Sequence, residues 1–172
     1  MEVDLEALLT GEDTPELLTV VEIRVGSRNK YEPEMWITVW DRVLPGNLRF
    51  LADYGVIPST ISAADVEPLD TAMFTLNSVF PGCLVQARVV GTLEVVEAGN
   101  TEHNIFAVPD KDPRFDDIDS LEDPPDQNLR EVEQFYVTSR QMERDEQAET
   151  RSWHGLENTY EVIHDGAQER TG

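Results

Sequence analysis

Short β-forming segments separated by turn signals fill the first two thirds of the chain, and this pattern limits the possible folds more than any other feature. Residues 17–25 are rich in β-branched side chains, and residues 84–93 alternate between apolar and polar side chains. Glycine, proline and asparagine at residues 26–29 and 45–47 mark turns between such segments. We therefore expect many short strands, which could close as a small barrel.

Two helices are expected near the C-terminus. Residues 127–146 form the longer one, and these side chains fall near one of its faces: Leu129, Val132, Phe135, Tyr136, Ser139 and Met142. A second helix carries Leu156, Tyr160 and Ile163. Strands followed by helices predict an α+β fold. The length favours one domain over residues 1–172, with residues 1–16 and 165–172 partly frayed.

The charge balance is strongly acidic. Asp and Glu number 35 against 13 Lys and Arg, which gives a formal net charge of −22. Such a charge strains a compact fold through self-repulsion, which molar salt screens. Because the acidic residues are dispersed along the chain, we favour a protein of a salt-accumulating halophile. An acidic interaction protein from an ordinary cell is the alternative.

Several classes of partner and location are disfavoured. The chain shows no basic patch for nucleic acid and no apolar run of about 18 residues for a membrane span. The acidic N-terminus lacks a signal-peptide pattern, so we expect a cytoplasmic protein. Cys83 is the single cysteine and is expected to be a small core residue, and the three histidines show no zinc-ligand spacing.

The segment over residues 65–70 holds the densest group of candidate ligands. Asp65, Glu67 and Asp70 stand directly before an apolar stretch, and Pro68 indicates a loop or strand end. Carboxylates on such a rigid support suit Mg²⁺, which takes oxygen ligands in octahedral geometry. In so acidic a chain the same cluster also arises by chance. The residues alone therefore leave a metal site and a solvated acidic loop both open.

Several segments, taken in order, carry a resemblance to a known family. They are Lys30-Tyr31-Glu32, Asp41-Arg42-Val43, Tyr54-Gly55-Val56-Ile57, Asp65-Val66-Glu67-Pro68-Leu69-Asp70 and Asp112-Pro113-Arg114-Phe115. The ordered set resembles the family I soluble inorganic pyrophosphatases, of a haloarchaeal type. The resemblance implies a closed five-stranded, OB-like β-barrel flanked by helices, several Mg²⁺ ions and cleavage of pyrophosphate to two phosphates. It also implies assembly into a homohexamer.

The resemblance also implies roles for individual residues. The metal ligands would be Asp65, Asp70, Glu102 and Glu22. The substrate-binding residues would be Lys30, Glu32, Arg42, Tyr54 and Arg140. Glu67 would be the catalytic base, although the family has an aspartate there, and the extra methylene moves the carboxylate by about a bond length.

Other departures from the family pattern predict a degenerate site. Val96 stands at the position of a metal aspartate, and strand alternation is expected to point the neighbouring Glu97 away from the site. Asn104 replaces a phosphate-binding lysine and Ser139 a phosphate-binding tyrosine. The remaining departures are Glu102 for an aspartate, Phe50 for a tyrosine, and Val66 for the glycine of the signature.

These departures leave three interpretations. The first is a Mg²⁺-dependent pyrophosphatase with weakened activity. The second is a non-catalytic protein that binds a phosphorylated ligand or assembles with an intact paralogue. The third is hydrolysis of a different diphosphate, because an altered set of phosphate-binding groups would tolerate another substrate.

Overall fold

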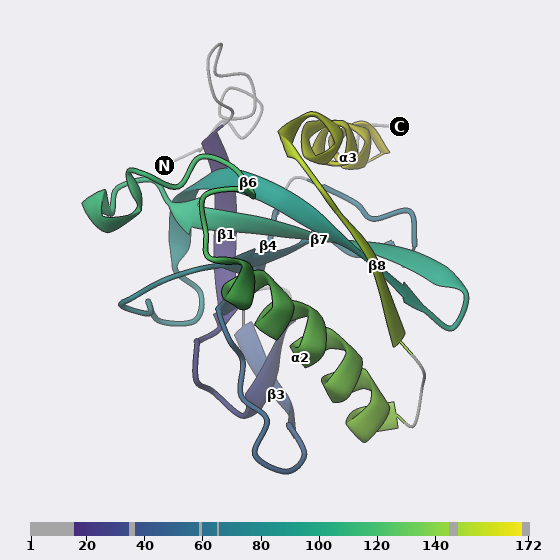
Figure 1. Ribbon diagram of the computed structural model, residues 1–172. Coiled ribbons are helices and arrows are strands. Elements are labelled where there is room, and N and C mark those ends of the chain that lie inside the picture. Colours follow the sequence, from purple (N-terminus) through teal and green to yellow (C-terminus); the bar gives the residue numbers. More distant parts are fainter. Residues whose placement is uncertain (1–15, 35–36, 59, 65, 145–147, 170–172) are drawn as a thin grey trace.

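A closed ring of five strands forms the centre of the molecule (Figure 1). The computed structural model describes residues 16–34, 37–58, 60–64, 66–144 and 148–169. The ring strands are β1 (Glu16–Ile23), β4 (Asp53–Val56), β5 (Asp70–Met73), β7 (Asn100–Pro109) and β6 (Leu84–Glu97), in that spatial order. Pairing of β1 with β6 closes the ring, and β5 with β7 is its parallel pair. Closure removes the unpaired edges that an open sheet of this size would expose.

Three further strands extend this barrel. Strand β8 (Ala148–His154) pairs with β6 from outside the ring. Strands β2 (Asn29–Glu34) and β3 (Ile37–Val43) form a separate antiparallel hairpin. A short 3₁₀ helix, η1 (Pro113–Phe115), lies in the segment between β7 and the long helix, where Asp112 caps its N-terminus.

Two helices cover different parts of the barrel. Helix α2 (Asp126–Arg144) and helix α3 (Leu156–Glu169) lie on opposite sides of the strands in Figure 1. Val132, Phe135 and Tyr136 of α2 pack on one cluster of barrel side chains, which includes Leu93 and Phe106. Ile163 of α3 packs on a second cluster, which includes Val21 of β1 and Met73 of β5. In β7, neighbouring residues alternate between the two cores: Phe106 belongs to the first, and Ile105 and Ala107 belong to the second.

The α+β fold and the five-stranded barrel predicted from the sequence are confirmed. Strand β8 was not predicted, because only Ala148 and Trp153 in it are apolar. Two burial expectations are wrong: Met142 is exposed rather than packed, and Cys83 is half-buried rather than in the core. Helix α3 extends beyond Asp165, the residue from which the sequence predicts a frayed end.

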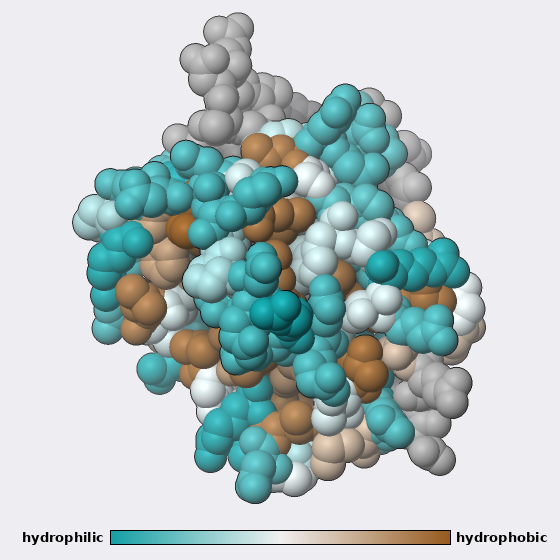
Figure 2. All heavy atoms as spheres, in the orientation of Figure 1, coloured by the Kyte–Doolittle hydropathy of each residue, from teal (hydrophilic) through white to brown (hydrophobic). Residues whose placement is uncertain are grey.

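The surface shown in Figure 2 is dominated by hydrophilic side chains. They spread over α2 and α3, and hydrophobic side chains form only small separate patches between them. Among the described residues, no helix is long and apolar enough to cross a membrane.

Candidate active site

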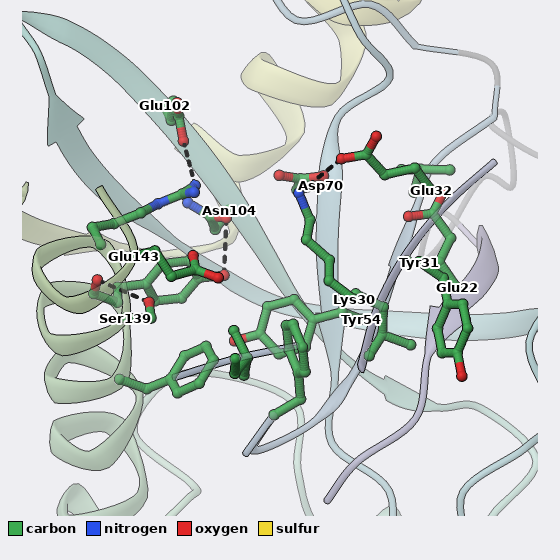
Figure 3. Close-up of a pocket in the computed structure, with 18 of the residues that line it drawn as sticks. Glu22, Lys30, Tyr31, Glu32, Tyr54, Asp70, Glu102, Asn104, Ser139 and Glu143 are labelled. Atoms are coloured by element: carbon green, nitrogen blue, oxygen red, sulfur yellow. Dashed lines mark hydrogen bonds and ion pairs between the residues drawn. The ribbon is translucent and has the colours of Figure 1, made fainter. Parts of the chain in front are cut away.

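A pocket of about 570 Å³ opens between one end of the barrel, the β2–β3 hairpin and helix α2 (Figure 3). Nine of the ten site residues predicted from the sequence line it: Glu22, Lys30, Glu32, Arg42, Tyr54, Glu67, Asp70, Glu102 and Arg140. The tenth, Asp65, lies outside the described residues. The barrel, hairpin and helix therefore bring together side chains that are more than 100 positions apart in the chain.

Glu22 enters the pocket because β1 contains a bulge. The register between β1 and β4 shifts between Val21 and Ile23, so the extra residue, Glu22, turns out of the regular alternation. Burial raises the pKa of the Glu22 carboxyl from its usual 4.5 to about 8, and the nearby charge of Asp70 adds to the shift while Lys30 opposes it. Near neutral pH, the Glu22 carboxyl is therefore largely protonated in the folded chain.

The β2–β3 hairpin contributes both cations predicted to bind phosphate. Lys30 and Arg42 are direct cross-strand partners, so their side chains leave the hairpin together. The Nζ atom of Lys30 lies 3.0 Å from Oε1 of Glu32. Arg42 contacts Asp41 and forms a two-pronged pair with Glu143 of α2, with Nε–Oε1 at 2.9 Å and Nη2–Oε2 at 3.2 Å. This forked contact orients the guanidinium plane at the pocket wall.

Helix α2 lines the opposite wall with a single stripe of side chains. Tyr136, Ser139, Arg140 and Glu143 recur at helical spacing and all reach the pocket. The Ser139 hydroxyl donates to the backbone oxygen of Tyr136 at 3.2 Å. Burial raises the pKa of the Tyr136 hydroxyl well above its usual value, so it stays protonated and can donate.

The end of the β6–β7 hairpin corrects one prediction. Leu93, Val95 and Glu97 share the face that packs toward α2, so Glu97 lines the pocket and is 5% exposed, while the half-buried Val96 does not reach it. The expectation that Glu97 points away is wrong because β6 continues through Glu97 to a tight turn at Ala98 and Gly99. Glu97 therefore adds a carboxylate to the pocket, whereas the family resemblance had assigned this position to Val96.

Asn104 is the most deeply buried polar side chain in the pocket, at 3% exposed. Tyr136 donates its hydroxyl to Asn104 Oδ1 at 2.9 Å, which fixes the amide so that Nδ2, without a hydrogen-bond partner in the described structure, is available as a donor (Figure 3). Phe50 packs edge-on against Tyr54, with ring centroids 5.1 Å apart. Burial raises the pKa of the Tyr54 hydroxyl, which keeps it protonated. The pocket thus offers neutral donors beside its charged groups.

The loop before β5 carries the remaining carboxylates. Asp70 is the first residue of β5 and pairs with Val56, and Glu67 and Pro68 precede it at the pocket rim. The backbone closes this loop with hydrogen bonds from Ser62 N to Glu67 O and from Val66 N to Ser62 O. The structure therefore confirms that this segment is a loop that leads directly into a buried strand.

Val66 adopts a backbone conformation that β-branched residues avoid. Its φ is 65°, and its side chain is 77% exposed, so it gains little from packing in return. The left-handed conformation disfavours a residue with a Cβ by roughly 1–2 kcal/mol, against about 0.5–1 kcal/mol for the added chain entropy of glycine. We expect Val66→Gly to raise the free energy of unfolding by about 0.5–1 kcal/mol in urea titrations. Val39→Gly, in exposed strand β3, should lower it, and equal effects of the two changes would contradict the strain.

The donor set of the pocket suits a divalent cation. Seven carboxylates line it against three basic side chains, and oxygen donors of this kind are the ligands that Mg²⁺ prefers. Burial is the main cause of the raised pKa of Glu22, and the charges of Asp70, Glu32 and Glu67 add to it. Within the described part of the chain, no three carboxylate, imidazole or thiol groups lie close enough together to form a metal site. The oxygen donors of the pocket suit a cation chemically, and Asp65 lies outside the described part of the chain.

Three pocket residues were missed by the sequence analysis: Glu97, Tyr136 as a pocket residue, and Glu143. The last two lie at helical spacing from Ser139 and Arg140, so the period of α2 would have identified them. Identifying Glu97 would have required knowing which residues of strand β6 point toward the pocket.

Comparisons with known proteins point to one family. The family description "Inorganic pyrophosphatase" matches residues 19–171. The chain is similar to an inorganic pyrophosphatase of Haloferax volcanii, with 37% identity over 161 residues that cover 92% of this chain and 90% of the relative. It is also similar to one from Geobacillus stearothermophilus, with 37% identity over 145 residues that cover 83% and 87%. The crystal structure of the Thermus thermophilus inorganic pyrophosphatase superposes with a TM-score of 0.87 at 29% identity and covers 99% of this chain and all of that one. The chain therefore belongs to the inorganic pyrophosphatase family.

Proposed function

We propose that this protein hydrolyses pyrophosphate to two phosphates with Mg²⁺, at a rate below that of a pyrophosphatase with the full family set of site residues. The observation that carries the proposal is the pocket itself. Two basic side chains of the β2–β3 hairpin face a set of carboxylates from β1, the β5 loop and β5, in a chain of the pyrophosphatase family. Pyrophosphate needs both groups, because cations must hold its oxygens and carboxylates must hold the metal.

Glu22 and Asp70, together with Asp65 as predicted from the sequence, are the proposed metal ligands. When bound, Mg²⁺ neutralises charge on the phosphoryl oxygens and lowers the pKa of an attacking water. Glu102 is a fourth ligand by resemblance, but in this chain it contacts Arg140. Lys30 offsets part of the negative charge around Glu22.

The other side chains are proposed to bind and orient the substrate. Lys30 and Arg42 bind phosphoryl oxygens, while Glu32 and Glu143 hold these two cations in position. Tyr54 stays protonated and donates a hydrogen bond. Glu67, at the rim, accepts a proton from the attacking water, and its extra methylene relative to aspartate loosens that contact.

Two neutral side chains support the proposal of reduced activity. Asn104 offers an amide where the family pattern has a lysine, and the Ser139 hydroxyl donates to the backbone oxygen of Tyr136 in its own helix. Removing one pre-organised electrostatic contact lowers the rate by ~10²–10³-fold. Residues that act as a unit are not additive, so turnover well above the uncatalysed rate is still expected.

Phosphate release from pyrophosphate, measured in molar KCl with Mg²⁺, tests the proposal. We expect the native protein to release phosphate, and Asp70→Asn to reduce the rate by ~10²–10³-fold, because the amide cannot hold a cation as a carboxylate does. Asp117→Asn removes an exposed acid from the segment before α2 and should leave the rate unchanged. Equal rates for the native protein and Asp70→Asn would contradict the proposal.

Isothermal titration with pyrophosphate separates hydrolysis from binding alone. Tight binding without phosphate release would support the alternative of a non-catalytic protein that binds a phosphorylated ligand or assembles with an intact paralogue. Release from another diphosphate but not from pyrophosphate would support a changed substrate. Assembly into a homohexamer, adaptation to molar salt and a cytoplasmic location stay predictions from the sequence.

A further inference from the structure

Arg140 bridges two carboxylates that come from the two strands of one hairpin. Its Nε atom lies 2.9 Å from Oε2 of Glu97, near the end of β6. Its Nη2 atom lies 3.5 Å from Oε2 of Glu102, near the start of β7 (Figure 3). One guanidinium from α2 thus contacts acids of both strands.

The two carboxylates need a cation at this point. Glu102 is the direct cross-strand partner of Val95, and Glu97 lies two residues further along the same face of β6, so the two acids are diagonal neighbours. Like charges in this relation repel, and burial strengthens the repulsion. The side chain of Glu97 is only 6% exposed and that of Glu102 is 28% exposed, so water screens them poorly.

The guanidinium is suited to this place. It is always charged, and its planar fork can contact two carboxylates at once, as a divalent ion between two ligands does. The side chain of Arg140 is 20% exposed, so it lies largely inside the pocket wall. Because Arg140 is part of α2, its guanidinium is present beside the two carboxylates at every metal concentration and competes with an incoming ion for them.

The carboxylates at the opposite end of the pocket are in a different situation. Glu22 and Asp70 line that end of the pocket together with Lys30 (Figure 3). The lysine is paired with Glu32, with 3.0 Å between Nζ and Oε1. At one end of the pocket, therefore, an arginine lies between two carboxylates, and at the other end a lysine accompanies two of the proposed metal ligands.

We propose that the guanidinium of Arg140 takes the place of a divalent cation between Glu97 and Glu102, so that these two carboxylates bind no metal ion in this chain. The inference rests on the proposed function, since it concerns how many metal ions the hydrolytic site holds. Metal binding is then confined to the end of the pocket formed by Glu22 and Asp70. Removing the guanidinium should open a second place for an ion.

Counting bound Mn²⁺ by electron paramagnetic resonance, in molar KCl and without substrate, tests this directly. We expect Arg140→Gln to bind one more Mn²⁺ per chain than the native protein. Arg140→Lys retains the charge and should match the native count. Arg151→Gln, which removes an arginine of the outer strand β8 that pairs with Glu94 of β6, should also match the native count. A folded Arg140→Gln protein with the native count would overturn the proposal.

A second variant keeps the test decisive if Arg140→Gln does not fold. Replacing both Glu97 and Glu102 with glutamine, with Arg140 intact, should leave the number of bound Mn²⁺ ions unchanged. Loss of one ion would show that these carboxylates bind metal in the native chain and would overturn the proposal. Phosphate release is measured separately, so an inactive protein would contradict the proposed function while the ion counts still decide the role of Arg140.

Discussion

Glu22→Gln is expected to stabilise the metal-free protein strongly at pH 8.5 and to remove its pyrophosphatase activity. Burial, with Asp70 nearby, raises the pKa of Glu22 from 4.5 to about 8 in the folded chain. The folded state therefore binds the proton more tightly than the unfolded state does. The contribution to stability is fully present below pH 4.5 and is lost as the pH rises to about 8. Glutamine, which is never charged, avoids this loss.

The expected size follows from the shift. One pH unit of pKa difference corresponds to about 1.4 kcal/mol, so the variant should gain on the order of 3–5 kcal/mol in free energy of unfolding at pH 8.5 and about 1 kcal/mol or less at pH 5. Urea unfolding at both pH values, with divalent ions removed, measures the two differences. Glu32→Gln, at a more exposed carboxylate of the same pocket, should change stability by about 1 kcal/mol or less at either pH.

Magnesium should reverse the effect of Glu22→Gln. A bound cation favours the ionised carboxylate, so Mg²⁺ should stabilise the native protein at pH 8.5 more than it stabilises the variant. A stability difference that is the same at pH 5 and pH 8.5 would mean that Glu22 does not titrate as a buried acid. The expected result, in contrast, would mean that the Glu22 carboxylate destabilises the metal-free protein and contributes only when a cation is bound. Such a loss of stability is expected of a functional group.

Gly55→Ala is expected to destabilise the protein by about 3 kcal/mol or more, because the added methyl group has no room. A Cβ at Gly55 would overlap the carbonyl oxygen of Val20 and lie 2.8 Å from its carbonyl carbon. These are backbone atoms of β1, so relief requires β1 and β4 to separate. Both strands supply pocket residues, Glu22 and Tyr54, and hydrolysis should therefore fall together with stability.

Gly155→Ala is the matched control for Gly55→Ala. A Cβ at Gly155 meets no atom within 4 Å, so we expect a change within about 0.5 kcal/mol. Urea unfolding followed by tryptophan fluorescence compares the two variants with the native protein. Equal stability of the two variants would contradict the close approach of β1 and β4.

Much of the fold could be predicted because its signals are local. The β-branched segments became strands β1 and β6, and the turn residues at 26–29 and 45–47 separate elements as expected. The helical period of α2 placed Val132, Phe135 and Tyr136 on the buried face. Strand β8 escaped prediction because its seven residues carry little apolar signal of their own. Its pairing with β6 and the contact of Trp153 with Phe106, at a centroid distance of 4.7 Å, decide its conformation.

The residues of the candidate site were likewise predicted only in part from the sequence. The described residues with ordered family segments around them were found from the sequence and line the pocket: Lys30, Glu32, Arg42, Tyr54, Glu67 and Asp70. Glu97 was excluded because the phase of strand alternation cannot be known before the end of the strand is known. Glu143 lies outside the segments that carry the family resemblance. Its pairing with Arg42 depends on α2 lying against the β2–β3 hairpin.

The sequence by itself therefore determined which segments form strands, turns and helices, and which of them carry carboxylates and cations, because these properties depend on neighbouring residues. The tertiary structure decided which side chains meet. Barrel closure joins β1 to both β4 and β6, a bulge turns Glu22 inward, and α2 brings Arg140 between Glu97 and Glu102. These relations depend on register and on contacts between distant segments, and a shift of one residue in a strand would send each side chain to the other face.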